Sequence, residues 1–98
     1  MFVHSVYFWL KEDMSAGEVE DFKKGLESLT NIPSVDHGFY GTPAQTDRPI
    51  IDRTYNFGLT IVNKDYEAQM EYQEDPVHDK FREDFEKYFD RVQIYDYD

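Results

Sequence analysis

The stretch FVHSVYFWLK, residues 2–11, decides the fold because apolar side chains emerge from both of its faces. If this stretch is a strand, one face carries Phe2, His4, Val6, Phe8 and Leu10, and the other carries Val3, Ser5, Tyr7, Trp9 and Lys11. A strand with one solvated face alternates apolar and polar residues, so this strand is expected to be covered on both sides.

The next segment contains the signals of a helix start and a helix stop. Ser15 and Glu18 have the spacing of a capping box, and an apolar stripe follows them to near Asn31. Pro33 prevents the helix from continuing. A helix is therefore predicted between these signals, and it would cover one face of the first strand.

Three more strands and a split helical region complete the expected fold. The strands are predicted at Val35–Tyr40, Arg53–Val62 and Arg91–Tyr97, and the helices at Asp65–Gln73 and from Asp75-Pro76 onward. Gly38 suggests a bulge or a close backbone approach in its strand. No repeat or linker interrupts residues 1–98, so one domain is expected. The order β-α-β-β-α-β predicts an α+β fold of ferredoxin-like topology, with helices on one face of a four-stranded antiparallel sheet.

The face of this sheet that points away from the helices would carry Tyr7 and Trp9. A patch of exposed aromatic side chains on a sheet is best explained by a partner that covers it. We therefore expect a two-fold homodimer whose two sheets face each other, which is a dimeric α+β barrel.

The composition argues against several classes of function. With 21 acidic and 10 basic residues, the net charge of −11 disfavours nucleic acid as a partner. No stretch reaches the roughly 20 apolar residues of a membrane span, so no membrane partner is expected. The absence of cysteine in so small a domain favours a cytoplasmic location. No metal or cofactor is expected, because the chain lacks paired metal-binding histidines, a phosphate loop and a dinucleotide fingerprint.

A set of family markers occurs in order along nearly the whole chain. They are His4 with the strand to Leu10-Lys11, Gly25-Leu26-x-x-Leu29, Ile32-Pro33, Val35, the strand from Tyr55 to Ile61, Tyr72 with Pro76 and His78, and Asp96. In this order and spacing, the chain resembles the stress-responsive dimeric α/β-barrel (Dabb) family. The resemblance implies the same dimeric barrel, and most members of the family lack an assigned activity.

The resemblance also implies candidate catalytic residues. A plant member of the family is a polyketide cyclase that catalyses an intramolecular aldol condensation. Its motif corresponding to Tyr72–His78 supplies a catalytic tyrosine and a catalytic histidine, and a further histidine that matches His4 lies in the same pocket. This chain keeps all three residues but has Asp75 where the cyclase has another histidine, so its pocket chemistry can differ.

The residues themselves indicate a pocket in the same place. His78 lies on the same side of its predicted helix as Phe81 and Phe85, while His4 lies on the strand face expected under the helices. Together with the Tyr72 hydroxyl, the two imidazoles can form an acid–base set. Three interpretations remain open: hydrogen-bonded core residues, a small-molecule pocket without catalysis, and acid–base catalysis. A cavity of about 300 Å³ or more, open to solvent, would favour ligand use.

We predict that this pocket, between the helices and the sheet, binds a small apolar molecule. The catalytic candidates are His4, Tyr72 and His78, and the ligand-binding walls are expected to be Val6, Phe8, Phe22, Leu26, Phe81 and Ile94. The polar loop Thr42–Asp52 is expected to act as its lid. The predicted function is that of a stress-responsive Dabb-type protein of unassigned activity. The alternative is a cofactor-free cyclase, lyase or monooxygenase that uses His78 and Tyr72.

Overall fold

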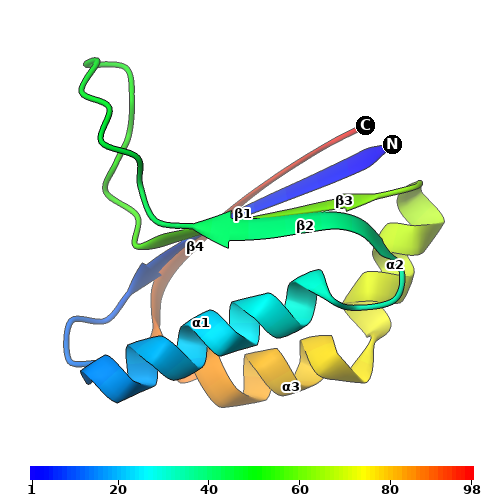
Figure 1. Ribbon diagram of the computed structural model, residues 1–98, viewed down its shortest axis with the longest axis horizontal. Coiled ribbons are helices and arrows are strands. Elements are labelled where there is room, and N and C mark those ends of the chain that lie inside the picture. The colour runs from blue at the N-terminus through cyan, green and yellow to red at the C-terminus, as the bar shows by residue number, and fades with distance from the viewer.

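A four-stranded antiparallel sheet forms one layer of the molecule, and helices form a second layer on one of its faces (Figure 1). The computed structural model describes all residues, 1–98. Its elements are β1 (Phe2–Leu10), α1 (Ala16–Thr30), β2 (Val35–Gly41), β3 (Phe57–Asn63), α2 (Tyr66–Glu74), α3 (Pro76–Phe85), the 3-10 turn η1 (Glu86–Tyr88) and β4 (Phe89–Tyr97). The strand order β2-β3-β1-β4, with every neighbouring pair antiparallel, confirms the ferredoxin-like fold.

The predicted capping box starts α1. Ser15 Oγ accepts a hydrogen bond from the Glu18 N–H at 3.1 Å, and Glu18 Oε1 accepts one from the Ser15 N–H at 2.8 Å. The helix then runs for 15 residues to Thr30. Neither this helix nor the shorter ones combine the length and the apolar character that a bilayer crossing requires.

Asp75 ends α2 and also begins α3. Its backbone N–H donates to the Tyr72 carbonyl, and its side-chain Oδ1 accepts from the Val77 N–H at 2.8 Å. Pro76 occupies the first turn of α3, where no intrahelical N–H is needed. This break at one residue leaves Tyr72 near the end of one helix and His78 near the start of the next.

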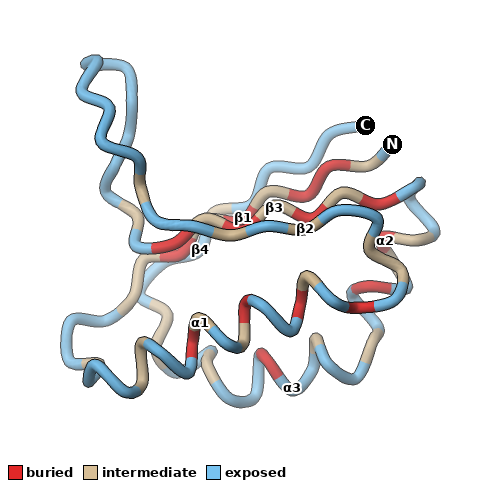
Figure 2. Tube along the Cα trace, in the orientation of Figure 1, coloured by how far each residue is buried: buried red, intermediate tan, exposed pale blue.

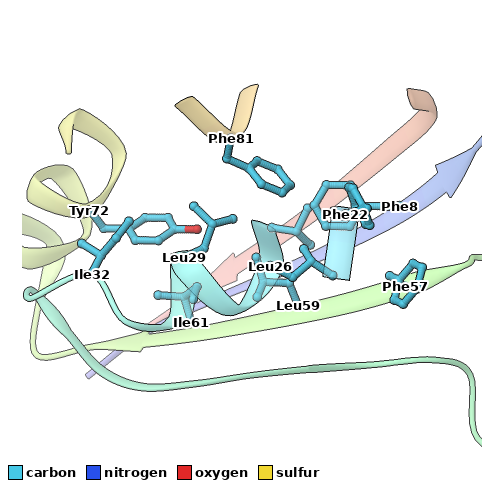
Figure 3. Close-up of a cluster of buried hydrophobic side chains, with 11 residues drawn as sticks. Phe8, Phe22, Leu26, Leu29, Ile32, Phe57, Leu59, Ile61, Tyr72 and Phe81 are labelled. Carbon is cyan, nitrogen blue, oxygen red and sulfur yellow. The ribbon is translucent and has the colours of Figure 1, made fainter. Parts of the chain in front are cut away.

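The core lies between the helices and the centre of the sheet, where the buried residues gather (Figure 2). The cluster consists of Val6, Phe8, Phe22, Leu26, Leu29, Ile32, Phe57, Leu59, Ile61, Tyr72 and Phe81 (Figure 3). Gly25 lets α3 pack closely against α1, because a Cβ at this position would lie 2.5 Å from the Phe85 ring. This close approach fixes α3 above the β1 side of the sheet.

Two strands begin at residues other than those predicted. β3 begins at Phe57 instead of Arg53, because the residues before it bond elsewhere: Arg53 Nη1 donates to the Thr46 carbonyl at 2.8 Å, and the Asn56 N–H donates to the Phe8 carbonyl of β1 at 2.8 Å. β4 begins at Phe89, ahead of the predicted Arg91. Apolar alternation does not reveal hydrogen bonds of this kind, so it did not show where β3 starts.

The second strand shows both features that its glycine suggested. The pairing of β2 with β3 shifts register between Val35 and His37, which is a bulge. A Cβ on Gly38 would lie 2.9 Å from the Thr30 Cβ, so the glycine allows the end of α1 to pack directly on β2.

Residues Thr42–Asn56 form an arm without regular secondary structure, and it projects from the side of the sheet that the helices leave open (Figure 1). The prediction that Thr42–Asp52 is a lid over a helix-side pocket is wrong for the protomer. The arm rises on the opposite side of the sheet, and it contributes no residue to the helix-side cavity.

Candidate functional site

A cavity of about 330 Å³ lies between α3 and the helix-facing side of the sheet. Its apolar walls are Val6, Phe8, Leu29, Leu59, Phe81, Phe89, Val92 and Ile94. Its polar lining consists of His4, Tyr72, Gln73, His78, Arg82 and Glu86. The volume lies at the lower end of the range of about 300 to 1,000 Å³ that is typical of small-molecule sites. The cavity therefore meets the size criterion for ligand use.

Most of the predicted site residues line this cavity, but two do not. His4, Val6, Phe8, Tyr72, His78, Phe81 and Ile94 lie on its walls. Phe22 and Leu26 are instead fully buried in the core, with 0 % exposure, because α1 packs them directly against the sheet. Leu29 from α1, and Phe89 and Val92 from β4, complete the wall.

A larger groove of about 590 Å³ between α1 and α3 is not the candidate site. Its lining includes the charged side chains Glu18, Asp21, Lys24, Lys80 and Asp84. Lys80 and Asp84 already form an exposed ion pair at 2.9 Å. Neither imidazole nor the Tyr72 hydroxyl reaches this groove, so it brings together no acid–base set.

His4 is held at the polar end of the cavity by Asp96. The two residues are antiparallel partners on β1 and β4, and His4 Nδ1 lies 2.6 Å from Asp96 Oδ1. The His4 side chain is 5 % exposed, whereas that of Asp96 is 44 % exposed. Because a carboxylate oxygen accepts, Nδ1 donates, and in the neutral form of the ring the Nε2 atom is an acceptor.

The pairing of His4 with Asp96 is one part of the site that the sequence analysis did not predict. The alternation of Ile94 and Asp96 places both on one face of the last strand, and this pattern carried the signal. The register between β1 and β4 was also needed, because a shift of one residue would have turned Asp96 to the other face.

Tyr72 lies between the two imidazoles. Its ring makes an edge contact with His4 at a centroid distance of 5.9 Å and with His78 at 5.1 Å. The residue is 1 % exposed, and burial raises the pKa of its hydroxyl above the ordinary value. The hydroxyl therefore stays protonated near neutral pH. It points away from Ile32 and into the core cluster (Figure 3), and it makes no hydrogen bond within the chain.

His78 lies in the first turn of α3 with one ring nitrogen buried and unpaired. Its Nδ1 atom has no hydrogen-bond partner. Burial lowers the pKa of His78, the positive charge of Arg82 lowers it further, and Asp79 acts in the opposite direction. A neutral imidazole with a free nitrogen can accept a proton or a hydrogen bond from a molecule in the cavity.

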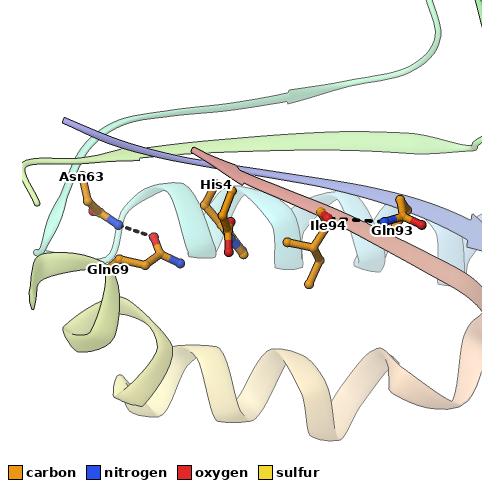
Figure 4. A network of polar contacts seen from close by, with 6 residues as sticks. His4, Asn63, Gln69, Gln93 and Ile94 are labelled. Atoms are coloured by element: carbon orange, nitrogen blue, oxygen red, sulfur yellow. Dashed lines mark hydrogen bonds and ion pairs between the residues drawn. The ribbon is translucent and has the colours of Figure 1, made fainter. Parts of the chain in front are cut away.

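A second polar pair ties α2 to the sheet beside His4. Asn63 Nδ2 donates to Gln69 Oε1 at 2.7 Å, and both residues are at most 2 % exposed (Figure 4). The same view shows Ile94 pointing from β4 toward α3, which is the direction of the cavity. No group of three or more His, Asp or Glu side chains in the structure could hold a metal ion.

The comparisons with known proteins identify a family and a fold. The model of the "Stress responsive A/B Barrel Domain" (Dabb) family matches residues 2–98. A Dabb family protein of ferredoxin-like fold from Mesorhizobium loti is 26% identical, with a TM-score of 0.79, over 99% of this chain and 94% of that chain. No curated protein matches the chain.

Two further solved structures share the fold at lower identity. A dimeric ferredoxin-like protein of unknown function from Thermobifida fusca is 16% identical, with a TM-score of 0.79, over 98% of this chain and 88% of that chain. A hydroxynitrile lyase from Passiflora edulis is 15% identical, with a TM-score of 0.80, over 98% of this chain and 90% of that chain. At these identities the likeness establishes the fold alone.

The pKa of the His78 imidazole in the folded protein is expected to lie below the ordinary value of about 6.5, because burial disfavours the charged ring. Below that pH the unfolded chain then binds more protons than the folded one. The free energy of unfolding should therefore fall as the pH falls from 6.5 toward the folded-state pKa, and His78→Gln should reduce this fall. An NMR titration of the imidazole, with urea unfolding at each pH, measures both. A folded-state pKa at or above 6.5 would contradict the proposed burial.

Proposed function

The chain belongs to the stress-responsive A/B barrel domain (Dabb) family, and we propose that it acts as a homodimer that binds a small, largely apolar molecule. In this proposal each protomer binds one molecule in the cavity between α3 and the sheet. A role in the stress response is part of the same proposal, and the family supports it. So is a cytoplasmic location, which the absence of cysteine supports.

One observation carries the ligand proposal: the cavity of about 330 Å³ has apolar walls and, among its polar lining, a buried ring nitrogen without a hydrogen-bond partner. This is the Nδ1 atom of His78, and the Tyr72 hydroxyl, which makes no hydrogen bond within the chain, belongs to the same lining. A buried polar group without a partner costs about 1 to 3 kcal/mol. A ligand with a hydroxyl or carbonyl group would supply the missing partners, and its apolar body would fill the walls. The fitting ligand class is a small phenol, alcohol or ketone.

The homodimer proposal rests on the chemistry of the sheet face that the helices leave open. The strand register places on this face Val3, Ser5, Tyr7, Trp9, His37, Phe39, Gly41, Gly58, Thr60, Val62, Arg91, Gln93, Tyr95 and Tyr97. None of these is acidic, although the chain contains 21 acidic residues. Phe39, Tyr95 and Tyr97 are 59 to 60 % exposed. The strands therefore bring no carboxylate to a contact between two such faces, and that contact can bury their aromatic rings.

The relatives are consistent with this assembly, because the Thermobifida fusca structure of the same fold is described as dimeric. Within the protomer, Tyr7 makes an edge contact with Tyr55 at 5.0 Å, and the guanidinium of Arg91 lies 4.3 Å from the Trp9 ring centroid. The aromatic face is thus ordered before a partner arrives. An ordered face loses less side-chain entropy when it associates.

A second candidate function is cofactor-free acid–base catalysis, and the neutral state of His78 favours it. With a ketone in the cavity, the imidazole would accept a proton from the carbon next to the carbonyl, and the electron pair of that C–H bond would move to the carbonyl oxygen. The Tyr72 hydroxyl would donate a hydrogen bond to the resulting enolate oxygen. The His78 imidazolium would then return the proton to the product, while His4, held by Asp96 at 2.6 Å, would accept a hydrogen bond through its Nε2 atom. This is the proton chemistry that a cyclase or lyase requires.

Binding can be tested with thymol, a small apolar phenol, by isothermal titration calorimetry. His78→Ala should weaken binding by at least about tenfold, which corresponds to the loss of one buried hydrogen bond. Ile94→Trp should abolish binding by filling the cavity, since Ile94 lines it and is 47 % exposed. Val77→Ala is the matched control, because Val77 precedes His78 on α3 but does not line the cavity. Unchanged affinity in Ile94→Trp would contradict a ligand site here.

Catalysis can be separated from binding with acetophenone in deuterated buffer. If His78 accepts the proton, the protein should accelerate deuterium exchange at the methyl group, and NMR would detect it. His78→Ala and Tyr72→Phe should each lower the rate by about a hundredfold, while Val77→Ala should leave it unchanged. If His78→Ala exchanges the methyl protons as fast as the wild type, the acid–base candidate is wrong, and the binding proposal is unaffected.

The homodimer can be tested by light scattering after gel filtration at micromolar concentration. The wild type should have twice the protomer mass of 11.7 kDa. Tyr95→Glu should dissociate it, because it puts an acid on the open face. Tyr66→Glu should not, since Tyr66 is equally exposed, at 61 % against 60 %, but lies on α2. A wild type with the mass of one protomer would refute the assembly.

A further inference from the structure

We infer that the arm Thr42–Asn56 is a clasp that reaches past the open face and holds the second copy of this chain. The inference rests on the proposed homodimer and adds an interaction surface to it. In this view the face-to-face contact of the two sheets is only part of the interface. The remainder is made by each protomer's arm against the flank of its partner.

The root of the arm is fixed to β1. The Asn56 N–H donates to the Phe8 carbonyl at 2.8 Å, and Asn56 Oδ1 accepts from the Leu10 N–H at 2.7 Å. Trp9 Nε1 donates to Thr54 Oγ1 at 2.9 Å. Three consecutive residues of the central strand thus hold the arm, so its direction is set by the sheet.

The two limbs of the arm are also joined to each other. Arg53 on the returning limb donates from Nη1 to the Thr46 carbonyl at 2.8 Å, and from Nη2 to Gln45 Oε1 at 3.4 Å. Near the tip, the Ile51 N–H donates to the Arg48 carbonyl at 2.9 Å and closes a turn. A connection of this length that served only to link β2 and β3 would not need such bracing.

The tip of this braced arm carries apolar side chains into solvent. Ile50 is 82 % exposed and Ile51 is 37 % exposed. Neither belongs to the core cluster or to the apolar residues packed against it. The hydrophobic effect favours burial of such side chains, and the protomer offers them no place. A surface outside the protomer would provide it.

The position and charge of the arm indicate which surface this is. The arm projects on the same side as the open face (Figure 1), and it is continuous with that face through Tyr55, whose ring contacts Tyr7 at 5.0 Å and Trp9 at 6.3 Å. A second copy seated on the open face would therefore lie beside the arm.

The charges of the arm also fit an identical partner. Within Thr42–Asn56 the acids are Asp47 and Asp52 and the bases are Arg48 and Arg53, so the arm has two negative and two positive charges and a net charge of zero. The whole chain has a net charge of −11. A neutral arm can approach a protomer of that charge without the repulsion that the acidic helices would meet.

The absence of cysteine in the chain allows a direct test by cross-linking. Ile50→Cys is labelled with benzophenone maleimide, unlabelled and ¹⁵N-labelled chains are mixed, and the dimer is irradiated. Mass spectrometry should find cross-linked peptides that join a light and a heavy chain. Val77→Cys, at an exposed position on α3, is the control and should give no such pairs.

A second measurement is the dimer dissociation constant, which Ile50→Asp should raise by about tenfold. Tyr66→Asp should leave it unchanged.

The outcomes separate the clasp from the homodimer. If the wild type is a dimer by mass, but every cross-link from position 50 stays within one chain and Ile50→Asp dimerises normally, the clasp is wrong and the homodimer stands. If the wild type is a monomer, both are wrong. Mixed-isotope cross-links together with a weakened Ile50→Asp dimer would establish the clasp.

Discussion

The structure depends on β1 having apolar side chains on both of its faces. This strand lies at the centre of the sheet, between β3 and β4, and its helix-facing residues Val6 and Phe8 are buried under α1 and α3. Its other face carries Tyr7 and Trp9, which the helices cannot reach. Within the protomer the helices bury the first of these faces, and a second copy would bury the other. The fold and the proposed assembly thus follow from one strand.

The same strand determines where the candidate site lies. His4 faces the helices, and the register with β4 puts Asp96 opposite it at 2.6 Å. The helix break at Asp75 then brings Tyr72 and His78 together from two different helices, with their rings 5.1 Å apart. The site therefore combines a long-range register with a local helix break. A change in the register would separate His4 from Asp96, and a change in the helix break would separate Tyr72 from His78.

Local signals predicted much of this structure. The capping box at Ser15 and the Asp75-Pro76 pair lie within one helical turn of the ends that they set, so the sequence alone revealed them. The burial of Phe22 in the core and the pairing of Asp96 with His4 depend on contacts between distant segments. The helical stripe showed that Phe22 faces inward, but it could not show whether that side meets a cavity or the packed sheet. The direction of the arm was equally hidden, because hydrogen bonds to β1 determine it.

We propose that a second protomer covers the open face, and the single tryptophan of the chain reports on this contact directly. Trp9 lies on that face, so its fluorescence depends on whether the face is exposed to water or covered by a second protomer. Acrylamide quenching measured over a dilution series is the decisive experiment. If the face is covered, quenching should be weak at micromolar concentration and should become stronger, with a red-shifted emission, as dilution separates the protomers. Strong quenching that is the same at every concentration would contradict it.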